Sequence, residues 1–253
     1  MKKCRAAVLA GILVIGPGFG ALHAIGFEAG IGVTQQYPWG EVSYKGTSLD
    51  LRNELNYGQI NTITGRLKVE LPLFLPNLYF KANPMTFEGT SLRSTAFKFG
   101  DSVFSAGIPF TSTLKLDHYD ATLFYGVPFL KTATADVLNV EFGLNVRIID
   151  FKEETKQPLS GLAQSKALTL GVPMGYAGIQ ISPIDLIKVE GELKGIAYGN
   201  NRFYDAAGRV KLKVLPLLFV SGGYKFQNIH IDQSDVVCDL RFGGPVLEVG
   251  LQY

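Results

Sequence analysis

The chain has 253 residues, 47% of them hydrophobic and 18% charged, and 24 basic side chains nearly balance 22 acidic ones. Nothing about this balance suggests nucleic-acid binding. The length suffices for one large β domain or two small ones, and no linker or low-complexity tract divides it.

The first 24 residues have the pattern of a secretory signal peptide. MKKCR carries three positive charges, an apolar stretch follows, and small residues precede a predicted cleavage after Ala24. Removal of this segment leaves residues 25–253 as one predicted domain with 21 basic and 22 acidic residues, a formal charge of −1. Cys238 is then the only cysteine, so an internal disulfide is impossible and the thiol is predicted to be buried or idle.

Alternating apolar and polar residues predict β-strands along the rest of the chain. In segment 137–151, six apolar residues from Leu138 to Ile148 alternate with polar residues such as Asn139 and Glu141. A period of two indicates a strand, because neighbouring side chains of a strand point to opposite faces. Ten strands are predicted, within a range of roughly 8 to 12. They are the segments 26–34, 62–71, 77–83, 114–126, 137–151, 168–181, 187–197, 204–214, 218–226 and 236–253.

In two of these strands the apolar residues change face. Segment 114–126 changes parity near His118, and segment 168–181 changes parity near Pro173. We interpret both changes as β-bulges, in which one extra residue shifts the alternation.

The predicted connections differ between the two ends of the sheet. The odd-numbered connections are predicted to be long polar loops, at 35–60, 88–110, 152–166, 199–202 and 228–235, although the fourth of these is short. The even-numbered ones, at 72–76, 127–136, 182–186 and 215–217, are mostly short and place a proline among large aliphatic residues. The second loop contains AFKFGDSVF, which predicts an extra hairpin through Gly100 and Asp101.

Alternation leaves open whether the apolar face lies inside a soluble barrel around an apolar ligand or outside against lipid. Three features favour the outside. The polar face carries closely spaced charges of both signs, which can pair across a barrel interior. An even strand number and unequal loop lengths are typical of outer-membrane barrels. A sheet in lipid must have no open edge, which explains why VLEVGLQY alternates up to the terminal Tyr253.

The ending LEVGLQY resembles the closing strand of bacterial outer-membrane β-barrels, in which a terminal aromatic residue is a signal to the assembly machinery. Leu247, Val249, Leu251 and Tyr253 match this pattern, although most such chains end in Phe. Segments such as GRLKVELPLFLPNLYF and PIDLIKVEGELKGIAY resemble a family of uncharacterised outer-membrane β-barrel proteins of Gram-negative bacteria, over nearly all of residues 25–253.

The resemblance implies an all-β fold and a location. The expected fold is a transmembrane antiparallel up-and-down β-barrel in the outer membrane, with both termini and short turns in the periplasm and longer loops outside the cell. The expected partners are outer-membrane lipid and the barrel assembly machinery. The resemblance implies no activity.

A ten-stranded barrel falls between the eight strands whose interior side chains fill and the sixteen or more that leave an open channel. Thirteen charged residues are predicted to face the interior: Arg66, Lys68, Glu70, Lys81, Glu141, Arg147, Lys188, Glu190, Glu192, Lys194, Arg209, Lys211 and Lys213. They either line a narrow polar passage or form an ion-paired plug, and small barrels are usually filled.

Three functions are open at this point. The first is a narrow passage for small solutes, or a purely structural membrane barrel. The second is binding or adhesion to an extracellular ligand through long loops that contain Tyr37, Trp39, Tyr44 and Tyr57, although such aromatic residues also suit the membrane interface. The third is a hydrolase at the outer rim, omptin-like or lipid-modifying, which requires the two remaining histidines to meet.

No catalytic, cofactor-binding or metal-binding residues are predicted, and a non-enzymatic role is favoured. No serine lies in a GxSxG elbow. The acidic segment DQSDVVCD lacks the glycine and carboxylate spacing of a calcium loop. Asp117 cannot assist His118 directly, because neighbours on a strand point to opposite faces.

Overall fold

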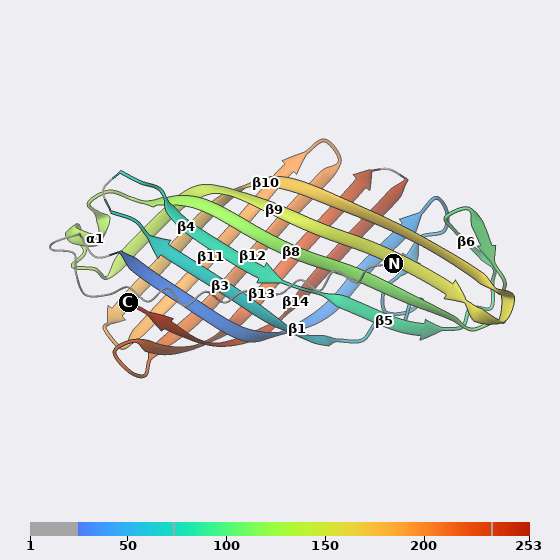
Figure 1. Ribbon diagram of the computed structural model, residues 1–253, viewed down its shortest axis with the longest axis horizontal. Coiled ribbons are helices and arrows are strands. Elements are labelled where there is room, and N and C mark those ends of the chain that lie inside the picture. The colour runs from blue at the N-terminus through green and yellow to red at the C-terminus, as the bar shows by residue number, and fades with distance from the viewer. Residues whose placement is uncertain (1–24, 73, 234) are drawn as a thin grey trace, which may run out of the picture.

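The computed structural model describes residues 25–72, 74–233 and 235–253, in which one antiparallel sheet closes on itself (Figure 1). The predicted signal peptide, residues 1–24, lies outside the described residues. The barrel strands are β1 (Gly26–Tyr44), β3 (Ile60–Glu70), β4 (Asn77–Asn83), β8 (Phe110–Gly126), β9 (Leu138–Gln157), β10 (Leu162–Ile184), β11 (Ile187–Tyr198), β12 (Asn201–Lys213), β13 (Leu218–Gln233) and β14 (Val236–Gln252). These are the ten predicted strands, and β5 (Thr86–Ser91) continues β4 along β8.

The ring closes through the pairing of the first strand with the last. β1 pairs with β14 from Glu28↔Gln252 to Tyr44↔Val236. The Tyr253 amide donates to the Phe27 carbonyl at 2.8 Å, and the Phe27 amide donates to the Tyr253 carbonyl at 3.0 Å. The chain therefore alternates up to Tyr253 because this residue belongs to the seam, the pairing of β1 with β14 that closes the barrel.

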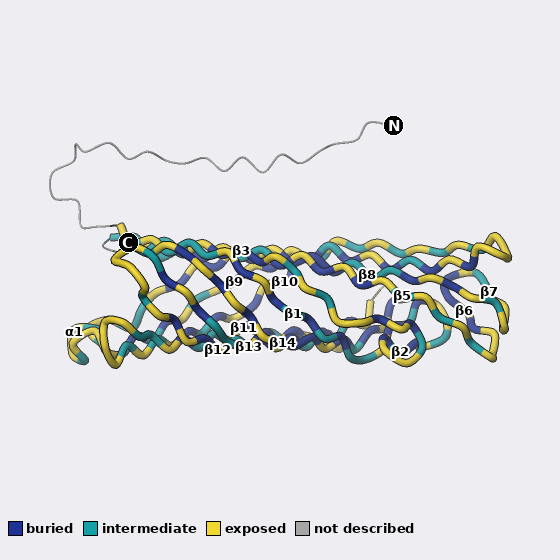
Figure 2. Tube along the Cα trace, turned by 90° about the horizontal axis from the view of Figure 1, so that it is seen from below, coloured by how far each residue is buried: buried dark blue, intermediate teal, exposed yellow. Residues whose placement is uncertain are grey.

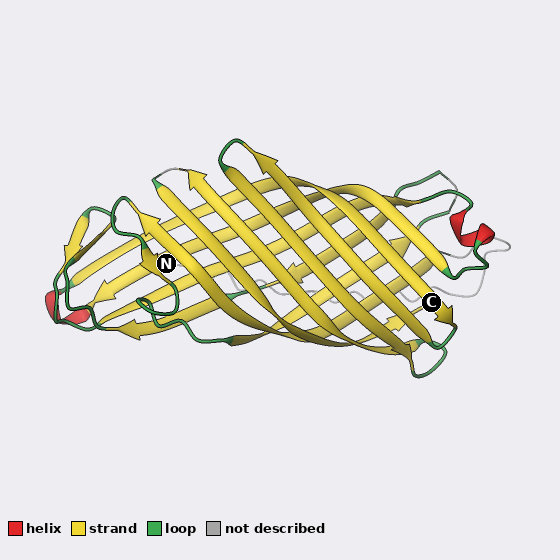
Figure 3. Ribbon diagram, turned by 180° about the vertical axis from the view of Figure 1, so that it is seen from behind, coloured by secondary structure: helices red, strands yellow, loops and turns green. Residues whose placement is uncertain are grey.

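The two ends of the barrel differ, as Figure 3 shows. The α1 end carries the short helix α1 (Leu130–Ala133) and Tyr253. The β6 end carries β2 (Leu49–Asp50), the hairpin of β6 (Phe97–Phe99) and β7 (Ser102–Phe104), and η1 (Pro158–Ser160). The predicted extra hairpin is thus confirmed. No helix in the described part of the chain has the length and apolarity needed to cross a membrane.

Several predicted loops at the β6 end are strands instead. β9 and β10 continue through most of segment 152–166, and β13 occupies residues 228–233 of the predicted loop 228–235. β1 likewise runs nine residues past the predicted loop start at Gln35, to Tyr44. The predicted loop bounds were wrong because these strand ends carry polar residues on their outward face, a pattern that resembles a solvated loop.

The polarity of both barrel faces inverts along each long strand. On β9 the outward positions are apolar from Phe142 to Ile148 and charged from Asp150 to Lys156. The inward positions change in the opposite sense, from polar residues such as Arg147 to apolar ones such as Phe151. Each strand therefore crosses two environments, with apolar surroundings near the α1 end and water near the β6 end.

This inversion explains the two parity changes, and the predicted bulges were wrong. The β8–β9 register is continuous from Thr111↔Lys156 to Gly126↔Glu141, through His118. The β9–β10 register is equally continuous through Pro173. No residue is inserted at either place. The apolar side chains pass from the outward to the inward face, and the polar side chains pass from the inward to the outward face.

An apolar core fills the barrel toward the β6 end, and Figure 2 shows buried residues at this end and along the middle of the barrel. Its fully buried members come from strands and from the first two loops: Val42, Leu49, Leu51, Leu55, Phe87, Phe99, Phe104, Leu114, Leu116, Ile149, Leu240 and Phe242. The loops between β1 and β3 and between β5 and β8 thus fold back into the barrel end and close it.

We expect Gly32→Ala to weaken the seam. A Cβ at this position would lie 2.4 Å from the Leu247 carbonyl oxygen of β14, so the strands must separate. Overpacking of this kind costs about 1–3 kcal/mol. The midpoint of heat-induced unfolding, followed by gel mobility in detergent, should fall by several degrees. Gly65→Ala on neighbouring β3 is the control, because its nearest atom lies 4.0 Å away, and equal effects would contradict the account.

Candidate functional site

The thirteen predicted interior residues all lie at inward positions, and they differ in depth. Eight are buried: Arg66, Lys68, Glu141, Arg147, Glu190, Lys194, Arg209 and Lys211. The side chains of Lys81 and Glu192 are nearly buried, whereas Glu70, Lys188 and Lys213 are partly exposed. A role of these residues in solute passage stays a prediction. Most of them form ion pairs in three clusters.

Glu141 on β9 is the centre of the first cluster. Its carboxylate accepts hydrogen bonds from Lys68 at 2.7 and 2.8 Å and from the Tyr176 hydroxyl at 2.8 Å. Asn139 and Gln180 each donate to it at 3.0 Å. A buried carboxylate needs such partners, because an unpaired ion in a low-dielectric interior is costly.

Arg147 on the same strand forms a second cluster across the barrel. It donates to both carboxylate oxygens of Asp120, at 2.7 and 2.8 Å, and to Asp205 at 2.7 Å. Lys194 donates to Asp120 at 3.1 Å and lies 4.7 Å from the centre of the Tyr79 ring. A bidentate arginine pair of this geometry is strong and rigid.

A third cluster lies between these and the seam. Arg66 donates from Nε to both Glu248 oxygens at 2.9 Å, and Lys211 bridges Glu28 and Glu190. Arg209 pairs with Glu190 and Glu192. Together the three clusters close the middle of the barrel with ion pairs.

Among the ion pairs in the middle of the barrel, the sequence analysis missed five charged residues: Glu28, Asp120, Asp205, Lys225 and Glu248. Four share the parity of a recognised polar face and could have been found from it. Asp120 was harder to find, because it follows His118, where the polarity of the strand inverts.

The α1 end of the barrel holds an open cavity of about 580 Å³. Glu70, Lys188 and Lys213 line it together with Lys131 and Asp185. Lys68, Glu28 and Lys211 also contribute to its walls. Water and small ions therefore have access from this end as far as the first ion pairs.

We expect Arg147→Met to destabilise the barrel strongly. The change leaves Asp120 and Asp205 without their main partner, and breaking a buried pair costs about 3–5 kcal/mol. Lys115→Ala is the control, because Lys115 pairs with Asp150 at 2.8 Å on the exposed surface, where the cost should be under about 1 kcal/mol. Denaturant unfolding in detergent micelles measures both, and equal losses would contradict the buried network.

The two histidines do not meet. His118 is inward and buried, and neither ring nitrogen has a hydrogen-bond partner within the described residues. His230 is at an outward position of β13, 3.7 Å from Asp239. The geometry that the hydrolase hypothesis required is therefore absent from the described chain. In the same residues, no group of three or more His, Cys, Asp or Glu side chains is placed to hold a metal ion.

The loop aromatic residues divide between the outer surface and the core. Tyr37 and Trp39 lie on the outward face of β1 and stack with ring centres 6.1 Å apart. Tyr44 and Tyr57 are buried in the apolar core. The aromatic residues of the first loop therefore do not form one exposed binding surface.

Glu153 is an isolated carboxylate inside the core at the β6 end. On β9 it lies beyond the apolar outward residues that end at Ile148. Among the described residues its carboxylate accepts one hydrogen bond, from the Tyr57 hydroxyl at 3.3 Å, and burial raises the pKa of Glu153 well above its usual value. The folded protein therefore holds a proton on Glu153 that the unfolded chain releases above about pH 4.3.

Stability should consequently fall as the pH rises from that value through the raised pKa, with a slope of up to about 1.4 kcal/mol per pH unit. We expect Glu153→Gln to remove this decrease, because glutamine is neutral at every pH. Glu154→Gln, on the exposed face of the same strand, should leave it in place. Unfolding curves between pH 4 and pH 8 measure the effect, and a pH dependence that survives Glu153→Gln would contradict it.

One strand edge at the β6 end has no neighbour. β10 pairs with β9 along Leu162–Ile181, but with β11 only from Gly175 onward. Within the described chain, no backbone hydrogen bond joins residues 163–173 to any element other than β9. Figure 1 shows β10 continuing toward the β6 end past the β11–β12 turn. Leu168 and Leu170 are only partly covered beside this edge.

The predicted assembly residues are all outward. Leu247, Val249, Leu251 and Tyr253 are between 45% and 73% exposed. They continue the apolar outward band of the barrel across the seam, so an apolar environment suits all four.

Solved bacterial outer-membrane proteins have similar structures. Ail, the attachment invasion locus protein of Yersinia pestis, solved with the heparin analogue sucrose octasulfate, is 10% identical, with 90% of this chain and 99% of that chain covered and a TM-score of 0.37. The translocator domain of autotransporter NalP from Neisseria meningitidis is 14% identical (91% and 89% covered, TM-score 0.41). The P. putida toluene transporter TodX is 9% identical (92% and 90% covered, TM-score 0.29). The sequence matches no family model and no curated protein.

Proposed function

We propose that this barrel lies in the outer membrane with its β6 end outside the cell, is closed to solutes, and binds extended polypeptide segments along the free edge of β10. The single observation that carries the binding role is this edge, which runs through residues 163–173. The proposal develops the second of the three open functions, with a strand edge in place of the aromatic loops.

The outward surface supports the membrane location. Apolar outward residues such as Leu144 and Val249 girdle the barrel toward the α1 end. Tyr37 and Trp39 lie where the outward face of β1 changes from apolar residues to Glu41. Aromatic residues concentrate at such borders in membrane barrels, and short turns mark the periplasmic end.

The interior supports a closed barrel. Solutes that enter the cavity at the α1 end first meet the ion pairs around Glu141 and Arg147, and then the apolar core. An ion would have to cross that core without hydrogen-bond partners, which costs several kcal/mol. A narrow passage is the second candidate, favoured by the open cavity, and it requires the core to move aside.

The free edge supports strand addition. An unpaired edge presents a row of amide and carbonyl groups that an extended peptide can pair with. Natural edges are commonly protected by lysine or proline. Within residues 163–173 these are Lys166 and, at the end that adjoins β11, Pro173, whereas residues 167–172 contain neither a charge nor a proline. Leu168 and Leu170 lie beside the edge and can contact the apolar side chains of a docked segment.

We expect the refolded protein to be electrically silent in a planar lipid bilayer. Ions pass only if both the ion pairs around Glu141 and Arg147 and the apolar core open. A variant that removes one interior charge, Arg147→Ala, should leave the bilayer silent as well, because the apolar core is unchanged. Steady, ion-selective steps from the wild type that change on Arg147→Ala would support the passage and contradict the closed barrel.

Edge binding is tested with short extended peptides selected by phage display against the detergent-solubilised protein. We expect selected peptides to show nuclear Overhauser contacts to amides within residues 163–173. Ser165→Lys, Ala167→Lys and Thr169→Lys together should weaken their binding at least tenfold, because edge lysines oppose strand addition. Thr86→Lys, Thr111→Lys and Thr113→Lys, on the paired strands β5 and β8, are the charge-matched control. Peptides that map elsewhere, or a selection without binders, would sink the proposal.

A further inference from the structure

The charges inside the barrel do not balance. The thirteen predicted and five additional interior residues comprise ten basic and eight acidic side chains. Because a buried charge without a partner is costly, the surplus of two positive charges requires neutralisation, deprotonation or contact with water. Lys188, Lys213 and Glu70 have such contact, since they are partly exposed and line the open cavity at the α1 end. Eight basic and seven acidic side chains remain in the set, so one positive charge is unbalanced.

Two other lysines lack close partners in the middle of the barrel. The Lys225 Nζ atom lies 3.7 Å from Asp205, and the Lys81 Nζ atom lies 3.9 Å from Glu192. Their side chains are only 4% and 9% exposed, and Lys225 Nζ has no hydrogen bond to any described residue. Both carboxylates already accept closer bonds, from Arg147 and Arg209 respectively.

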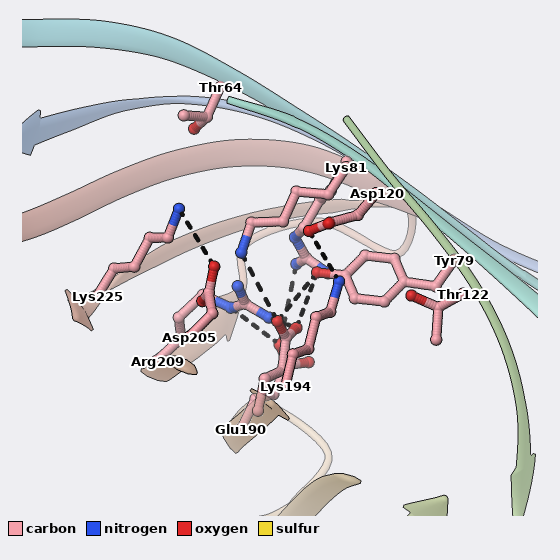
Figure 4. Close-up of polar contacts among 12 residues, drawn as sticks. Thr64, Tyr79, Lys81, Asp120, Thr122, Glu190, Lys194, Asp205, Arg209 and Lys225 are labelled. Atoms are coloured by element: carbon pink, nitrogen blue, oxygen red, sulfur yellow. Dashed lines mark hydrogen bonds and ion pairs between the residues drawn. The ribbon is translucent and has the colours of Figure 1, made fainter. Parts of the chain in front are cut away.

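These two lysines line the same small cavity. Its volume of about 20 Å³ leaves room for one water-sized particle. Arg66, Arg209, Thr34 and Thr64 also line it, and the two threonine hydroxyl oxygens are 3.2 Å apart. Figure 4 shows Lys81, Lys225 and Thr64 around this space. Glu248, the one carboxylate that lines it, is already held by Arg66.

We propose that this cavity binds one small monovalent anion, chloride under physiological conditions, between the ammonium groups of Lys81 and Lys225. Four cationic side chains around one particle-sized space favour an anion over water. The ammonium and hydroxyl groups supply the hydrogen bonds that a dehydrated halide needs. The bound ion offsets the one unbalanced positive charge and fixes both lysines in place.

Crystals of the wild-type protein grown with bromide in place of chloride test the site directly. The expected result is an anomalous difference peak in the cavity, within hydrogen-bonding distance of Lys225 Nζ. The absence of a peak, or density that refines as water in bromide, would overturn the proposal.

Stability in solution provides a second test through the effect of a ligand that binds only the folded state. The unfolding midpoint should be higher in chloride than in gluconate, which is too large for the cavity, at equal ionic strength. Lys225→Met should abolish this difference, with Lys81→Met as the alternative variant if the first does not fold. Lys188→Met, which changes a lysine outside the cavity, should retain it. An equal anion effect in all variants would contradict the site.

Discussion

Charges that cannot reach water must find partners, and this constraint shapes the interior of the barrel. Ten strands enclose too little space for an open column of water, so the carboxylates in the middle of the barrel are paired with bases from other strands. Arg147 on β9 reaches Asp205 on β12, and Lys68 on β3 reaches Glu141 on β9. The ion pairs therefore act as cross-links between strands that are not neighbours in the sheet, and the same constraint identifies Lys81 and Lys225 as incompletely neutralised.

The strands satisfy opposite requirements at their two ends. Toward the α1 end the outward side chains are apolar and the interior is charged, whereas toward the β6 end the outward side chains are charged and the interior is apolar. The hydrogen-bonded ladder continues through this exchange without a bulge on β8, β9 and β10. The half of the barrel toward the β6 end therefore resembles a water-soluble β domain that continues a membrane barrel. The free edge of β10 belongs to that half.

Much of the architecture could be predicted from sequence, because a period of two residues survives in every strand and the terminal Tyr253 requires a seam. The strand ends could not, because alternation such as that of Lys152, Glu154 and Lys156 occurs both in solvated loops and in strands whose outward face meets water. Where the polar face keeps the same parity along a strand, the interior charges can be identified from that parity. Their pairing, and the free edge of β10, depend on strand register and relative strand length, which single-sequence patterns do not contain.

The central claim is that the inversion of polarity marks the outer membrane boundary, with the β6 end outside the cell. The measurement is labelling of single-cysteine variants on intact cells with a charged maleimide that does not cross the outer membrane. The one cysteine of the described chain, Cys238, is buried, and the wild type gives the background. The account predicts that Lys156→Cys on β9 is labelled on intact cells and that Lys131→Cys on α1 is labelled only after the outer membrane is permeabilised. Labelling of Lys131→Cys but not Lys156→Cys on intact cells would contradict it.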